Sequence, residues 1–428
     1  MKFLGILLAC SCCLAQQETA TYFSVPPVDA PELAARGPWA VGVRTVQLVN
    51  PHQPDILHFD KDTGKAPLYD RPLTIEIWYP ATIPAGKEER VVYESAMPGT
   101  ARAGVPGSFH FAGKALRDAP QVTGKAFPLV VVSHGYPGSR TFMTWLTENL
   151  ASKGYVVAAI DHTDSVFGQQ RAFTSTLLNR AADQIFTIDA LADRSRDPGD
   201  FLHDVVDPSR VAIVGYSMGG YGALATAGAG YSRNGASARA IPGGYFDRWL
   251  ADSPEFQSRR REQIKALVAI APWGNQPPQN NWDAQGLAGI RIPSLFIAGD
   301  QDDVSGFEQG TRKAFNGAVN AERYLLVFEN ARHNVGGNPP PPEALGNFTT
   351  RAFFDEPVWR KDRIAAINQH FITAFLDLYL KGDTSRREYL SLPAKSPAGN
   401  QTWKGFQPRW APGLEWYHLA TGQQASPQ

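Results

Sequence analysis

Glycines surround one serine in the segment "RVAIVGYSMGGYGALA", residues 210–225. The pattern Gly215-x-Ser217-x-Gly219 follows a run of apolar β-forming residues and precedes small residues that favour a helix. In such a strand–turn–helix element the serine has a strained backbone and its hydroxyl projects above the sheet, so glycine is needed beside it. A helix that starts at Ser217 also favours negative charge there. The pattern therefore predicts that Ser217 is a nucleophile.

A serine hydroxyl needs a base to remove its proton, and a carboxylate must orient that base. The order expected along the chain is serine, acid, histidine. Three histidines follow Ser217. His333 lies in "FENARHNVGG", just past a buried strand, and is predicted to be the base. His370 lies within an amphipathic helical stretch and His418 in the C-terminal tail, so both are predicted to be structural.

Three aspartates in "LFIAGDQDDVSG" are candidates for the acid. Asp302 has the loop position expected of the acid, and Asp300 and Asp303 are the alternatives. The cluster could also be interpreted as a calcium loop. Val304 and Ser305 stand where such a loop needs an oxygen ligand and a glycine, which disfavours that interpretation.

A tetrahedral oxyanion needs two N–H donors. One is predicted to be the backbone N–H of Met218, which follows the nucleophile. The other is predicted in "HGYPG" after an earlier strand, where Tyr136 is the donor. His134 in the same motif is interpreted as a scaffold residue.

Three side chains near strand ends are predicted to contact a substrate: Tyr136, Trp273 and His162. Aromatic residues of this kind also fill cores, which is the alternative for Trp273. For His162, which follows Asp161 in "AAIDHTDS", a structural role is the favoured alternative. No metal or organic cofactor is predicted, because no cluster of His, Cys and Asp has ligand spacing.

Strands and helices alternate along the chain. Continuously apolar runs are typical of strands buried on both faces, which predicts a doubly wound α/β fold with a mostly parallel sheet of about eight strands. Helices are predicted within residues 141–154 and 362–382, and two earlier stretches, 41–49 and 72–80, suit an exposed antiparallel edge. The six apolar runs are residues 127–135, 155–162, 210–217, 266–273, 293–300 and 324–330.

Composition and the N-terminus limit the function classes. Forty-one basic and forty-one acidic residues give no net charge, so a nucleic-acid partner is not expected. Residues 1–15 have the layout of a signal peptide: one lysine, an apolar stretch from Phe3 to Ala9, and then small residues. The apolar stretch is too short to span a membrane. All three cysteines lie inside residues 1–15. The sequence predicts a secreted or periplasmic protein, with a lipid anchor at Cys10 or Cys12 as the alternative.

The motifs "FPLVVVSHGYPGSRTFMTWLTENLASKGYVVAAIDHTDS", "RVAIVGYSMGG" and "YLKGD" resemble the α/β-hydrolase branch that holds the platelet-activating factor acetylhydrolases and the dienelactone-hydrolase-like proteins. The resemblance covers most of residues 40–385. "GYSMGG", "APW" and "SLFIAGDQDD" also resemble bacterial cutinases and polyester hydrolases. This resemblance implies a secreted serine esterase with Ser217, Asp302 and His333 as its triad.

The sequence departs from each of these relatives. Dienelactone hydrolases use a cysteine where this chain has Ser217, so their chemistry does not transfer. Cutinase-like enzymes commonly carry disulfides and are compact, whereas this chain has insertions that would restrict access for a polymer. The predicted organisation is a signal peptide (1–15), an N-terminal extension (16–40), an α/β-hydrolase domain (41–385) with insertions near 81–126, 230–262 and 334–361, and a tail that packs on the domain (386–428).

The main hypothesis is hydrolysis of a small-molecule carboxylic ester with a small or medium acyl chain. The second is a lipase-like or cutinase-like hydrolase of lipids or polyesters. A third, from another class, is a non-catalytic binding protein on a hydrolase scaffold, which would have no need for Ser217, Asp302 and His333 together. The segment 81–126, rich in Gly, Pro and Ala, is interpreted as a surface excursion. The two later insertions are interpreted as a rim or cap around the site, with surface loops that have no binding role as the alternative.

Overall fold

The computed structural model describes residues 23–98, 106–258, 262–397 and 402–424. The predicted signal peptide and both cysteines proposed for lipid attachment lie outside these residues. Within the described ranges, no helix is both long and apolar enough to cross a membrane.

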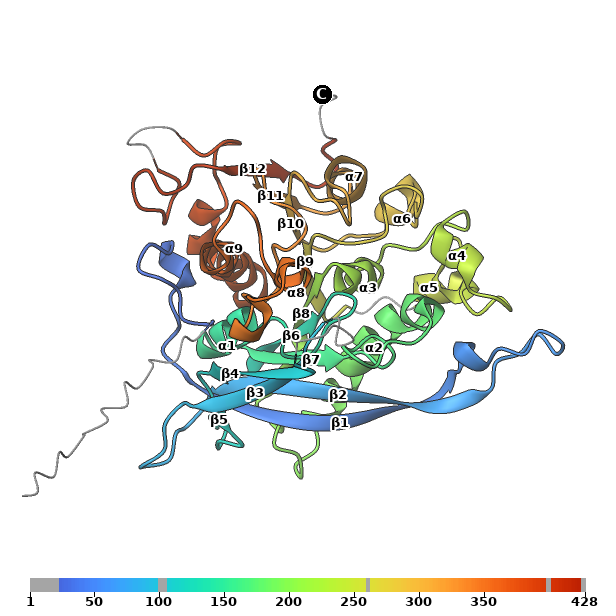
Figure 1. Ribbon diagram of the computed structural model, residues 1–428, viewed down its shortest axis with the longest axis horizontal. Coiled ribbons are helices and arrows are strands. Elements are labelled where there is room, and N and C mark those ends of the chain that lie inside the picture. Colours follow the sequence, from blue (N-terminus) through green and yellow to red (C-terminus); the bar gives the residue numbers. More distant parts are fainter. Residues whose placement is uncertain (1–22, 99–105, 259–261, 398–401, 425–428) are drawn as a thin grey trace, which may run out of the picture.

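A ten-stranded sheet dominates the part of the chain that is described, in the order β12-β11-β10-β9-β8-β6-β7-β2-β1-β5 (Figure 1). The six strands β6 to β11 are parallel and correspond to the six apolar runs in the sequence. They are β6 (Phe127–Ser133), β7 (Val156–Asp161), β8 (Val206–Tyr216), β9 (Ile264–Ile270), β10 (Ser294–Gly299) and β11 (Arg323–Phe328).

Antiparallel pairs occur toward both ends of the sheet. The long pair β1 (Ala40–Pro54) and β2 (Leu68–Ala81) lies beside β7, as the partly alternating pattern predicts. The sheet exceeds the expected eight strands because β5 (Leu116–Arg117) pairs with β1 and the tail supplies β12 (Leu414–Leu419). In Figure 1, β1 and β12 lie at opposite ends of the sheet.

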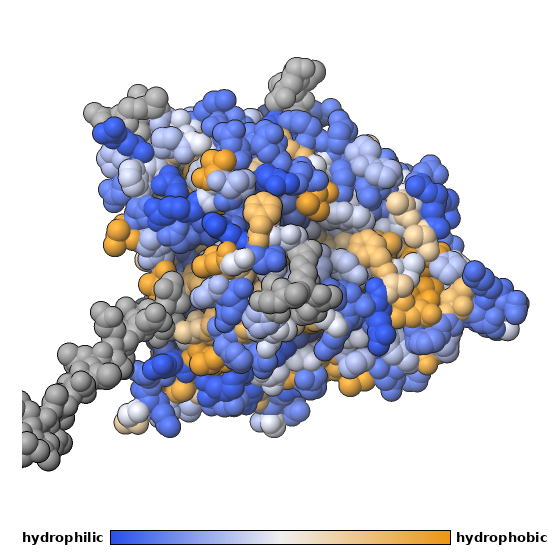
Figure 2. All heavy atoms as spheres, in the orientation of Figure 1, coloured by the Kyte–Doolittle hydropathy of each residue, from blue (hydrophilic) through white to orange (hydrophobic). Residues whose placement is uncertain are grey.

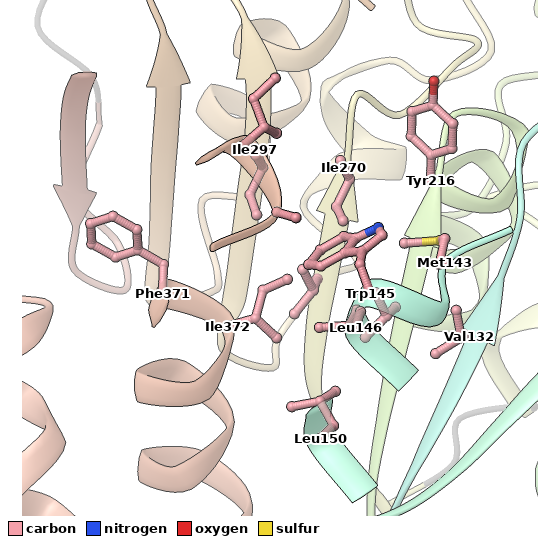
Figure 3. Packing of buried hydrophobic residues seen from close by; sticks show 14 of the residues in the cluster. Val132, Met143, Trp145, Leu146, Leu150, Tyr216, Ile270, Ile297, Phe371 and Ile372 are labelled. Atoms are coloured by element: carbon pink, nitrogen blue, oxygen red, sulfur yellow. The ribbon is translucent and has the colours of Figure 1, made fainter. Parts of the chain in front are cut away.

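Helices cover both faces, and alternate residues of each buried strand contact different layers. Val130 and Val132 of β6 belong to a core with α1 (Thr144–Ser152) and α9 (Lys361–Lys381). Figure 3 shows side chains of this core from α1, α9 and the sheet. On the other face, Leu129 and Val131 pack with α2 and α3. The remaining helices are α2 (Phe173–Arg194), α3 (Met218–Thr226), α4 (Ala236–Ala240), α5 (Pro254–Ser258), α6 (Ala284–Leu287), α7 (Lys313–Gly317) and α8 (Phe348–Phe354).

The segment 81–126 is more than a surface excursion, so that interpretation is corrected. It forms a two-stranded sheet of β3 (Val91–Ala96) and β4 (Ser108–Gly113). Tyr93, Met97 and Phe109 from this segment are buried in the core beside α1. The Gly, Pro and Ala content of the segment suggested a surface loop, but these few large side chains pack the hairpin against the domain.

The order of the strands locates a natural binding site. From β6 the chain crosses to β7 on one side, and it then returns to β8 on the other side of β6. Loops that leave the carboxyl ends of β6 and β8 therefore diverge, and in open α/β sheets ligands bind in the crevice at such a switch point. Ser217 follows β8 directly, and the loop with Tyr136 follows β6.

Candidate active site

Ser217 lies on the sharp turn between β8 and α3. Its backbone has φ 53° and ψ −115°, a strained conformation for a residue with a side chain. A Cβ on Gly215 would lie 2.2 Å from the carbonyl oxygen of Gly219, and one on Gly219 would lie 1.9 Å from that of Ser133. The glycines are thus required by close backbone packing, as the sequence predicts.

The structure brings Ser217, His333 and Asp302 together from three loops at the carboxyl edge of the sheet. The His333 Nε2 atom lies 2.9 Å from Ser217 Oγ, and His333 Nδ1 lies 3.0 Å from each Asp302 carboxylate oxygen. Ser217 and His333 are each 8% exposed and Asp302 is 6% exposed. This geometry allows proton transfer from the serine hydroxyl to an imidazole held by a carboxylate.

The other two aspartates after β10 have different partners. Asp300 accepts a hydrogen bond from the Asn330 backbone N–H at 2.6 Å. Asp303 pairs with the Arg332 guanidinium at the rim of the site. Asp302 is therefore the aspartate of this loop that contacts His333.

Hydrogen bonds hold Asp302 in its ionised form. Burial by itself would raise the pKa of its carboxyl. The neighbouring His333 and the backbone N–H donors of Ser305 and Val304, at 2.8 and 2.9 Å, outweigh that effect, and the pKa lies below its ordinary value. A charged Asp302 fixes the Nδ1–H tautomer of His333, which leaves Nε2 free to accept the Ser217 proton.

Two backbone segments adjoin Ser217 at the point where an oxyanion would form. Met218 opens α3, and the first N–H groups of a helix have no acceptor within the helix. Tyr136 lies in the loop after β6, whose neighbour Gly135 would place a Cβ 3.3 Å from the Cβ of Ser217. Both predicted oxyanion donors are thus next to Ser217 in the fold, and their role remains a prediction.

A cleft of about 450 Å³ opens at Ser217 and His333. Aromatic side chains from the β6–α1 loop, β8 and α8 form much of its wall, while its charged residues are three acidic and two basic. The aromatic residues are Tyr136, Phe142, Tyr216, Phe348 and Phe353, and the charged ones are Asp303, Asp355, Glu356, Arg332 and Arg351.

Of the two later insertions, residues 334–361 form a wall of the cleft, through α8 and the residues that follow it. Phe348 of α8 is 84% exposed. In Figure 1, α8 lies on the side of the molecule that faces the viewer. Figure 2 shows the same side, which is mostly hydrophilic with apolar residues in small groups. Residues 230–262 do not line this cleft in their described part; Tyr231 and Trp249 instead join the core on the α2–α3 face.

Two of the predicted substrate-binding residues lie outside the cleft and are corrected here. His162 is 1% exposed; it contacts Ser133 Oγ at 2.7 Å and Asp183 at 3.0 Å beneath the Tyr136 loop. Burial lowers the pKa of His162 to about 3, so it is neutral. Trp273 is not among the residues that line the cleft; its ring packs edge-on against Phe173, which in turn packs against Tyr136 of the cleft wall. The position of each residue after a strand predicted proximity to the site, but His162 is buried and Trp273 contacts Phe173 rather than the cleft.

The remaining predicted histidines have structural contacts. His134 is buried and its Nδ1 lies 2.7 Å from the Gly135 carbonyl oxygen. His370 is buried in α9 and accepts a hydrogen bond from the Leu33 backbone N–H. His418 stacks on Tyr324 with ring centroids 4.4 Å apart. None of these three lines the cleft.

Sequence reasoning missed the residues that anchor the His333 loop. Glu356 accepts hydrogen bonds from the backbone N–H groups of Arg332 and Asn334, on either side of His333. Tyr216, next to Ser217, donates its hydroxyl to the His333 carbonyl oxygen at 3.3 Å. Tyr216 could have been suspected from its place beside Ser217, whereas no local pattern marks Glu356. Among the described residues, no group of three or more His, Cys, Asp or Glu is arranged to hold a metal ion.

The mostly parallel sheet, with the sharp strand–turn–helix element that carries Ser217 after β8, defines the α/β-hydrolase fold. A ferulic acid esterase from Streptomyces cinnamoneus has a similar structure, with a TM-score of 0.51 and 22% sequence identity over 82% of this chain and 94% of that one. At this identity the likeness concerns the fold alone.

Sequence comparison finds relatives that are named as ester hydrolases. A family model described as PET hydrolase-like matches residues 104–243. Cutinase 2 of Thermobifida cellulosilytica is 27% identical over 205 residues, 48% of this chain and 59% of that protein. A bis(hydroxyethyl) terephthalate hydrolase of Streptomyces coelicolor is 23% identical over 208 residues, 48% of this chain and 50% of that protein. The chain thus spans between half and three fifths of these relatives and resembles cutinases and polyester hydrolases.

Proposed function

We propose that this protein is a secreted serine hydrolase that cleaves neutral carboxylic esters of small or medium acyl size. The observation that carries the proposal is the chain of contacts from Ser217 to His333 at 2.9 Å and from His333 to Asp302 at 3.0 Å, at the base of an aromatic cleft. Two of the relatives are named as a cutinase and a bis(hydroxyethyl) terephthalate hydrolase, which supports ester cleavage.

The mechanism follows from the atoms at the site. His333 Nε2 takes the Ser217 proton while Ser217 Oγ attacks the ester carbonyl carbon, and the negative oxygen receives hydrogen bonds from the N–H groups of Tyr136 and Met218. The tetrahedral intermediate expels the alcohol, which takes the proton from His333. Water then attacks the acyl-enzyme with His333 again as base, and the acid leaves as Ser217 regains its proton.

The cleft favours an uncharged acyl group. Its aromatic wall offers apolar contact, and its acidic residues outnumber its basic ones, with Arg332 paired to Asp303 and Arg351 paired to Asp355. An anionic substrate would find both guanidinium groups already engaged. The similarity to platelet-activating factor acetylhydrolases and dienelactone-hydrolase-like proteins stays a prediction from the sequence.

Hydrolysis of an aromatic polyester is the second candidate. Five aromatic side chains in the cleft suit a benzene ring, and the PET hydrolase-like match points the same way. The wall of residues 334–361 narrows access, which favours a short ester over a polymer chain. Export of the protein is proposed from the layout of residues 1–15.

Initial rates on p-nitrophenyl esters from acetate to palmitate test the proposal, with Ser217→Ala as the variant. Ser209→Ala, an exposed serine of the same strand, is the matched control. We expect a preference for short chains that Ser217→Ala abolishes and Ser209→Ala leaves intact. Rates that rise toward long chains, or release of terephthalate from polyester film, would favour the second candidate. Activity that survives Ser217→Ala would refute the assignment.

A further inference from the structure

The loop that carries His333 is joined to the cleft wall by a set of hydrogen bonds centred on Glu356. Glu356 follows α8, is buried, and lines the cleft. One of its carboxylate oxygens accepts the Arg332 backbone N–H at 2.8 Å, and the other accepts the Asn334 backbone N–H at 2.6 Å. A single carboxylate therefore holds the main chain on both sides of His333.

Further contacts make the wall and the loop one unit. The Asn334 side-chain amide donates to the carbonyl oxygens of Ala352 and Asp355, at 2.9 Å each. Lys361 at the start of α9 donates to the Asn334 carbonyl oxygen. The same hydrogen bonds therefore hold both the α8 wall, which an acyl group would contact, and the loop with His333, which would take the serine proton.

We propose, on the basis of the proposed esterase function, that Glu356 is a positioning residue that sets His333 against Ser217 and couples the α8 wall to the base. The carboxylate is needed because both of its oxygens accept main-chain N–H groups, and an amide has only one acceptor oxygen. In a Glu356→Gln variant the amide NH₂ would face an N–H donor. The loop would have to shift, and a small misplacement of a catalytic group is costly.

The negative charge of the Glu356 carboxylate also acts on His333. Burial raises the pKa of its carboxyl, against the effect of the two N–H donors and of Lys361, whose own pKa burial lowers to about 8. A negative Glu356 favours protonated His333, so loss of that charge should move the acid limb of the kcat/KM profile to lower pH. The charged and titratable groups around Glu356 are Lys361 from α9, Arg332 and His333 from the loop after β11, Tyr216 from β8, and Asp355 beside it.

The test uses the full chain with p-nitrophenyl acetate and butyrate as probes. Glu356→Gln is compared with wild type and with Glu343→Gln, an exposed glutamate of the same insertion. We expect kcat to fall about ten- to a hundredfold in Glu356→Gln, with KM changed less than about threefold and the acid limb moved to lower pH. Glu343→Gln should behave as wild type, and Glu356→Asp should be intermediate because it keeps the charge.

Several outcomes overturn the inference. The inference is refuted if kcat of Glu356→Gln equals that of Glu343→Gln, or if the variant changes only KM. It is also refuted if kcat falls while the acid limb does not move, because Glu356 would then have a purely structural role. Circular dichroism shows whether Glu356→Gln is folded. If it is not, Glu356→Asp decides, and wild-type kcat in folded Glu356→Asp refutes the inference. Wild-type protein that cleaves neither ester refutes the proposed function itself.

Discussion

Replacing Asp302 with asparagine removes one charge from the site and leaves its shape. Both carboxylate oxygens lie 3.0 Å from His333 Nδ1. At an effective dielectric constant of about 20, unit charges at that separation attract by about 5.5 kcal/mol. This attraction arises when His333 becomes protonated in the transition state, and it corresponds to about four orders of magnitude in rate. An asparagine can also hold His333 in the wrong tautomer.

We therefore expect kcat of Asp302→Asn on p-nitrophenyl butyrate to fall about 10³- to 10⁴-fold, with a smaller change in KM. Asp300→Asn is the matched control, because its amide oxygen can still accept the Asn330 N–H. It should stay within about threefold of wild type. An Asp302→Asn variant that keeps more than about a tenth of wild-type kcat, or an equal loss in Asp300→Asn, would refute this reasoning.

Two further predictions follow from single features. Gly215→Ala would place a Cβ 2.2 Å from a backbone oxygen, so we expect about a hundredfold loss of kcat or more, while Gly107→Ala, with no atom within 4 Å, should keep activity. Arg71 is 1% exposed and bonds Asp183 at 2.8 Å, so Arg71→Met should lower the free energy of unfolding in urea by about 3–5 kcal/mol; a loss below about 1 kcal/mol would contradict it.

The central strands could be predicted because their burial on both faces leaves a continuous apolar run. The edges could not be predicted as well. β12, "LEWYHL", is a short stretch in the tail, and its partner β11 is separated from it in the sequence by α8, α9 and the loops around them. The hairpin β3–β4 is held by Tyr93 and Phe109, two large side chains in an otherwise Gly-, Pro- and Ala-rich segment.

The Ser217 turn and the order serine, acid, histidine are local or topological signals, and the sequence therefore located Ser217, Asp302 and His333. The cleft wall follows from no such signal. Phe353 and Glu356 reach the site through the path of a long insertion, which no spacing in the sequence specifies. For His162, the sequence correctly predicted its position after a strand but not the direction of its side chain, which is buried against Asp183.

Reaction of the full chain with a fluorophosphonate, followed by peptide mass spectrometry, tests the central claim most directly. A fluorophosphonate forms a covalent bond with a serine that an adjacent base has activated. We expect one adduct, on the peptide with Ser217, that is absent in Ser217→Ala and forms at least about a hundredfold more slowly in His333→Ala. Folded protein that takes up no label, or that is labelled on another serine at the same rate in both variants, would contradict the claim.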